Sequence, residues 1–258
     1  MLHRYLRPLM LAAAFSALAL PGLPARAAAT LFHYYDFNNG STVTDLVGSM
    51  NGTLMDNANV SGGLLNLDGA GDYVQFTNHL IPIAGSYSFA FFARRDSFNG
   101  LYTEMISQGS SGGPGQYLGS DPGGNIRAGD LWGATGVPMG AVGAMTHYAL
   151  TVDAAGSTSS LYVNGLLAAQ VPFALIGTPG GSDARLGSQF APYAEYFHGA
   201  IDELRIYDGV LTPGEVLQLA TPVPEPASAL LMAAGLVWWA ARGGRKWAKK
   251  ARASLMSA

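Results

Sequence analysis

Apolar and polar side chains alternate along the chain from residue 30 onward, in short segments that end at glycine, asparagine, aspartate or serine. In the clearest segment, 87–93, the rings of Tyr87, Phe89 and Phe91 fall on one face of an extended strand. An apolar face of this kind has to be buried. Similar segments predict strands at 31–37, 52–55, 64–67, 73–76, 105–107, 115–119, 125–131, 147–152, 161–163, 166–168, 184–187 and 197–207.

Two local motifs define how these strands are connected and where they end. Asn164-Gly165, between two strand segments, is a residue pair that a type I′ hairpin turn prefers. Thr212-Pro213-Gly214-Glu215 has the form of a capping box with proline at the first helical position, and it predicts one helix that ends near Ala220. Many short strands with one terminal helix predict an all-β fold, an antiparallel β-sandwich.

The first 28 residues have the three-part layout of a secretory signal peptide. Arg4 and Arg7 precede an apolar core at 9–20, and small residues follow it. We expect signal peptidase to cleave after Ala27 or Ala29. The leader therefore predicts export of the chain.

A second three-part layout occupies residues 222–252. Its motif Val223-Pro224-Glu225-Pro226 precedes an uncharged apolar segment at 227–241 and a basic end at 242–252. As a helix, the apolar segment would be about 22 Å long, so it spans a hydrocarbon core of about 30 Å only with snorkelling cations or local thinning. The basic end predicts a transmembrane helix with residues before 223 outside, whereas a buried core helix is the alternative.

The region between these two ends is acidic and lacks cysteine. Residues 30–222 contain five arginines, no lysine and sixteen acids, which give a net charge of −11. This charge excludes nucleic acid as a partner of the domain, because nucleic-acid binding needs basic patches. The absence of cysteine excludes disulfides, thiol catalysis and zinc–cysteine sites.

The C-terminal layout resembles the PEP-CTERM sorting signal of Gram-negative bacteria. In that family a membrane protease, the exosortase, acts at the Pro-Glu-Pro, and relatives often travel with exopolysaccharide and biofilm genes. The resemblance implies that exosortase and signal peptidase are partners and that exopolysaccharide is a further candidate. It also implies a chain anchored in the inner membrane before processing, and located at the cell surface or in the extracellular matrix afterwards.

Four segments, at 68–74, 147–153, 161–165 and 197–213, resemble in their order the laminin-G-like, concanavalin A-like jelly roll of bacterial surface proteins. The resemblance implies such a domain at 30–220. Proteins of this fold often bind calcium, which needs six to eight oxygen ligands. Asp202 matches a position that relatives use structurally or for metal, and Asp36 and Asp45 could add oxygens. Alternatively, Asp202 caps a turn or pairs with Arg205.

Aromatic and polar side chains in the glycine-rich region suggest a carbohydrate site, because sugar rings stack on aromatic faces and polar neighbours orient them. The candidate binding residues are Trp132, Tyr102, Tyr117, Arg127 and Asp130. The alternative is that these aromatic side chains fill the core of the sandwich.

Catalysis is not expected from the acids of the last long strand. Glycosidases of this fold carry acids at spaced positions on one strand face, whereas Asp202 and Glu203 are adjacent and should point to opposite faces. The sequence thus predicts an exported, non-catalytic, carbohydrate-binding protein. A purely structural matrix protein and a degenerate glycosidase are the alternatives.

Overall fold

The computed structural model describes residues 28–111, 113–177 and 181–221. The predicted leader, apart from Ala28, and the predicted sorting segment at 222–252 lie outside these residues. Within the described part of the chain, no helix is long and apolar enough to cross a membrane.

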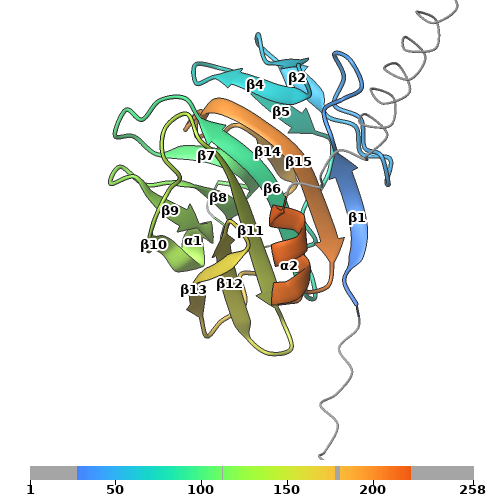
Figure 1. Ribbon diagram of the computed structural model, residues 1–258, viewed down its shortest axis with the longest axis vertical. Helices are drawn as coiled ribbons and strands as arrows, with labels where there is room; N and C mark the ends of the chain where they lie inside the picture. Colours follow the sequence, from blue (N-terminus) through green and yellow to red (C-terminus); the bar gives the residue numbers. More distant parts are fainter. Residues whose placement is uncertain (1–27, 112, 178–180, 222–258) are drawn as a thin grey trace, which may run out of the picture.

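Two antiparallel sheets pack face to face (Figure 1). The front sheet has the strand order β13-β12-β11-β6-β15-β4-β3, and β1 also pairs with β15. Its strands are β1 (Thr30–Tyr35), β3 (Asn59–Ser61), β4 (Leu64–Asp68), β6 (Tyr87–Arg95), β11 (Met145–Asp153), β12 (Thr158–Val163), β13 (Leu166–Val171) and β15 (His198–Asp208). The predicted all-β antiparallel sandwich is therefore confirmed.

The back sheet has the order β10-β9-β8-β7-β14-β5-β2. Its strands are β2 (Thr53–Met55), β5 (Tyr73–Phe76), β7 (Thr103–Gly109), β8 (Gln116–Ser120), β9 (Asn125–Ala128), β10 (Gly133–Pro138) and β14 (Asp183–Leu186). Alternate residues of both sheets face inward, among them Phe89 and Phe91 of β6 and Leu118 of β8, all fully buried. Each such side chain contributes about 1.5–3 kcal/mol on burial.

Helix α2 (Pro213–Ala220) lies on the outer face of the front sheet (Figure 1). It begins with the predicted capping box. The Thr212 side chain accepts a hydrogen bond from the Glu215 amide at 3.3 Å, and Glu215 accepts one from the Thr212 amide at 2.7 Å. Val216 packs with Tyr162 and Tyr207 in a small cluster on that face. The helix thus covers part of the sheet and leaves a groove beside its C-terminal end.

The local predictions are largely confirmed, and three details differ. The Asn164-Gly165 turn has φ of 49° and 79°, as a type I′ turn requires. The strand predicted at 125–131 ends early, because Gly129 has φ 57° and begins the short helix α1 (Gly129–Trp132). Strands β3 and β10 were not predicted, because neither shows a clear apolar alternation and both lie at a sheet edge.

Candidate functional site

Strand β15 changes its neighbour halfway along its length. Its first half pairs with β4 as far as Ile201 opposite Leu65. Its second half pairs with β1, starting from Leu204 opposite Tyr35. The pairings on this edge therefore skip residues 202–203.

The other edge of β15 contains a β-bulge at the same point. Asp202 pairs with Phe92 of β6, and the register then shifts before Arg205. Glu203 has φ 55°, a left-handed conformation that costs a residue with a side chain roughly 1–2 kcal/mol. Bulges and strained residues of this kind concentrate at functional sites, where they redirect side chains.

The bulge places three charged side chains on one face of β15. Leu204 is buried in the core, whereas Asp202, Glu203 and Arg205 all line a groove on the outer face. The expectation that Asp202 and Glu203 point to opposite faces is therefore wrong. Strand alternation fails here because Glu203 occupies the extra position of the bulge.

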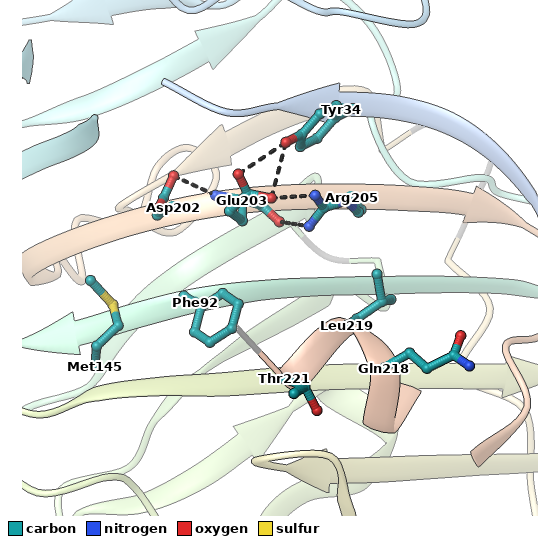
Figure 2. A pocket seen from close by; sticks show the side chains of 9 residues that line it. All are labelled: Tyr34, Phe92, Met145, Asp202, Glu203, Arg205, Gln218, Leu219 and Thr221. Atoms are coloured by element: carbon teal, nitrogen blue, oxygen red, sulfur yellow. Dashed lines mark hydrogen bonds and ion pairs between the residues drawn. The ribbon is translucent and has the colours of Figure 1, made fainter. Parts of the chain in front are cut away.

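The groove has a volume of about 540 Å³ and lies between β15 and the C-terminal end of α2. Figure 2 shows Tyr34 and the three charged side chains of β15 along one side, and Phe92, Met145 and Leu219 opposite them, together with Gln218 and Thr221. A volume of this size lies within the range of about 300–1,000 Å³ that is usual for ligand pockets. The full lining is Tyr34, Phe92, Met145, Asp202, Glu203, Arg205, Gln218, Leu219 and Thr221.

Glu203 is held in place by two neighbours. The Tyr34 hydroxyl donates to its two carboxylate oxygens at 2.9 and 3.0 Å, and Arg205 forms an ion pair with it (Figure 2). The Arg205 guanidinium also lies over the Tyr34 ring, 4.3 Å from the centroid. Burial raises the pKa of Tyr34 to about 12, so its hydroxyl stays protonated and can donate. The three side chains therefore form a fixed polar wall.

Asp202 is less constrained than Glu203. Its Oδ1 accepts from the Glu203 amide at 2.7 Å. Burial, together with the nearby charges of Glu203 and Asp36, raises the pKa of Asp202 to about 6. A half-buried carboxyl with a raised pKa in a groove is a common mark of a functional site.

Four of the five predicted ligand residues come together elsewhere, on the outer face of the back sheet. Arg127 of β9 forms ion pairs with Glu104 and Glu195, and its guanidinium lies 4.4 Å from the Tyr102 ring centroid and 4.5 Å from that of Tyr117. Burial raises the pKa of Glu104 well above its usual value, although the Arg127 charge opposes this. We call this set the Arg127 cluster.

Asp130 belongs to the same cluster, but Trp132 does not. Asp130 accepts hydrogen bonds from the Tyr117 hydroxyl at 2.9 Å and from the Gly115 amide at 2.6 Å. It lines, with Arg127, a hollow of about 230 Å³. Trp132 is half-buried and packs against the core, which was the alternative for this residue.

The three candidate calcium ligands do not form one site. Asp45 accepts from the His33 ring at 2.6 Å and from several backbone amides. Asp36 accepts a hydrogen bond from the Asn38 amide, and its negative charge helps to raise the pKa of Asp202. In the described part of the chain, no group of three or more acidic or histidine side chains could hold a metal ion. These residues do not fit a shared calcium site, and calcium binding stays an untested prediction.

The sequence profile of the concanavalin A-like lectin/glucanases superfamily matches residues 68–217, more than half of the chain. The chain belongs to this superfamily. The match includes most of the strands of both sheets and the greater part of α2. Comparison with curated protein sequences gives no match.

Several solved structures are similar to the chain in fold. Domain 4 of AbnA, an extracellular GH43 arabinanase from Geobacillus stearothermophilus in complex with arabinotriose, has a TM-score of 0.57 and 25% identity, over 75% of this chain and 99% of that domain. Trypanosoma rangeli sialidase has a TM-score of 0.57 at 18% identity, over 74% of this chain, which spans only 32% of the sialidase. The binding domain of botulinum neurotoxin serotype D/C has a TM-score of 0.56 at 11% identity, over 74% of this chain and 51% of that one. The last two similarities concern the fold alone.

Proposed function

We propose that the chain is an exported, non-catalytic carbohydrate-binding protein of this superfamily, and that the groove beside α2 holds the saccharide. The observation that carries the proposal is the bulge, which turns Asp202 and Glu203 toward the same groove. Sugar hydroxyls donate well to carboxylates, and the C–H faces of sugars pack on aromatic rings such as Phe92. The fixed Tyr34–Glu203–Arg205 wall costs little side-chain entropy on binding.

The similarity to the arabinanase domain supports this proposal, because that domain was solved with arabinotriose and the chain covers almost all of it. The arrangement of the acids argues for binding without cleavage. Glu203 has both oxygens engaged by Tyr34, and Asp202 is its chain neighbour, so the two do not flank a bond from opposite sides. We expect no release of reducing ends from any bound saccharide.

Replacing Phe92 by alanine should weaken oligosaccharide binding about tenfold, because the groove loses the aromatic ring on which the sugar would pack. The measurement is calorimetric titration of the full-length chain, in neutral detergent, with arabinotriose and a panel of other oligosaccharides. Tyr102→Ala, in the Arg127 cluster on the opposite sheet, is the matched control and should bind as the parent does. The reverse result would move the site to the Arg127 cluster. Binding of no saccharide would favour the structural matrix protein.

We also propose export and sorting of the chain, on the layout of its two ends. The leader at 1–28 directs it through the inner membrane, and the exosortase acts at Val223-Pro224-Glu225-Pro226 while the apolar segment at 227–241 holds the chain in that membrane. A domain of charge −11 without cysteine suits release to the cell surface or matrix.

In the native host, a tagged chain should lose its tail and reach the surface only when the exosortase is present. Its size and cell fraction, compared between the parent strain and an exosortase deletion, are the readout. A tail that stays attached in the inner membrane in both strains would make the protein a membrane-anchored periplasmic domain. That outcome would also remove the main support for exopolysaccharide as a partner.

A further inference from the structure

Asp202 is the acid in the groove that forms no ion pair with any of the described residues. Each of the five arginines of the domain has another partner: Arg94 pairs with Asp96, Arg95 donates to the Gly140 carbonyl, Arg127 pairs with Glu104 and Glu195, Arg185 pairs with Asp183, and Arg205 pairs with Glu203. Residues 30–222 contain no lysine. Among the described residues, the one hydrogen bond to Asp202 is that of the Glu203 amide to Oδ1.

The surroundings of Asp202 repel further negative charge and favour a positive one. On its own strand it faces Glu203 and Arg205, and the latter is engaged with Glu203. From the β1 side, Asp36 adds a second negative charge and Tyr34 a neutral hydroxyl. The groove is lined from β6 by Phe92, and from α2 and its C-cap by Gln218, Leu219 and Thr221, all of which are uncharged.

Histidine from β11 does not supply the missing cation. His147 lies beside Phe92, with ring centroids 5.0 Å apart, and burial together with the Arg205 charge lowers the pKa of His147 to about 4. Its ring is therefore neutral at the pH of most exported proteins. Among the residues that the structure describes, no positive group is thus left to pair with Asp202, and a cationic ligand would supply one.

We infer that the groove takes a saccharide that carries a protonated amine, as an amino sugar does, with its ammonium group against the Asp202 carboxylate. This inference rests on the proposed function and names the class of sugar. Phe92, Met145 and Leu219 would pack on the C–H face of the sugar, and the volume of about 540 Å³ accepts more than one ring. The net charge of −11 would draw a polycationic glycan toward the domain from a distance.

N-acetylation of the amine removes the charge and so provides the test. The full-length chain is titrated with a glucosamine tetrasaccharide and with its N-acetylated counterpart. At pH 7 the amine form should bind at least fivefold more tightly, because an ammonium–carboxylate contact is charge-assisted and partly shielded from water. Asp202→Asn keeps an acceptor for the Glu203 amide and should abolish this preference. Asp208→Asn is the matched control: it removes one negative charge from the exposed end of β15, and this variant should still prefer the amine form.

Lowering the pH repeats the test without a substitution, so a variant that fails to fold does not block it. With a pKa of about 6, Asp202 changes from mostly ionised at pH 7 to mostly neutral at pH 5, so the parent chain should lose most of its preference for the amine form over this range.

Several results would overturn the inference. A preference that survives in Asp202→Asn would reflect general attraction to an acidic domain. Equal binding of both tetrasaccharides by the parent would remove the inference and leave the proposed function intact. If neither tetrasaccharide nor any of the neutral oligosaccharides binds, both the inference and the proposed function are wrong.

Discussion

The Gly119→Ala chain is expected to unfold with a free energy about 3 kcal/mol below that of the parent. A Cβ at Gly119 would lie closer than 3.0 Å to the Thr103 carbonyl oxygen and to Oε2 of Glu104. In the sheet register, Gly119 of β8 is paired with Glu104 on one side and with Arg127 on the other. The Glu104 carboxyl reaches Arg127 across β8, directly above the Cα of Gly119, which carries no side chain. The added methyl group must displace backbone and the buried pair together, and each disturbance is costly.

Urea unfolding followed by circular dichroism measures this loss. Gly214→Ala in α2 is the control, because outside the adjoining helix backbone the nearest atom to a Cβ there is Thr212 Oγ1 at 4.0 Å, and alanine favours a helix. It should leave stability unchanged or raise it by up to about 1 kcal/mol. A Gly119→Ala chain as stable as the parent would show that the Glu104–Arg127 contact is not packed as described.

The parent chain should lose about 2–3 kcal/mol of stability relative to a His147→Leu chain when the pH falls from 7 to 4. His147 is 1% exposed, and its pKa is about 4 in the folded chain against 6.5 when unfolded. The unfolded chain therefore binds a proton on His147 at a higher pH than the folded chain does. The free energy of unfolding is unaffected by His147 above pH 6.5, and it decreases as the pH falls from 6.5 toward 4. The size of this loss follows from about 1.36 kcal/mol for each unit by which the folded and unfolded pKa values differ.

The comparison uses a difference between two chains because other groups titrate in the same range. The raised pKa of Asp202 acts in the opposite direction: it stabilises the fold at low pH, and this contribution is lost as the pH rises toward 6. That contribution is present in both chains and cancels to first order. Denaturant midpoints of the two chains from pH 4 to pH 7 give the answer, and parallel curves would contradict a buried neutral His147.

The fold could be predicted because its information is local. Alternation with period two identified β6, β11 and the other inner strands, and the sequence Thr212-Pro213-Gly214-Glu215 contains every group of the cap it forms. The edge strand β10 contains two glycines and a proline, and nothing local distinguishes it from a loop.

The site could be predicted only in part, because it depends on pairings between distant segments. Asp202 was identified by resemblance, but the position of Glu203 follows from the exchange of β4 for β1 beside β15, more than 130 residues away in sequence. Phe92, Met145 and Leu219 come from three elements and show no shared motif. The Arg127 cluster was easier to predict, since β8 and β9 are adjacent both in sequence and in the sheet.

The most direct test of the groove uses the methyl group of Met145 as a reporter. Met145 lines the groove and is 41% exposed, whereas Met105 is fully buried in the core and serves as the internal control. The full-length chain, labelled with ¹³C at its methionine methyl groups, is titrated with arabinotriose and with the glucosamine tetrasaccharide. Saccharide binding should shift the Met145 resonance in a saturable way and leave that of Met105 in place. Saturable binding without a change at Met145 would contradict the groove as the site.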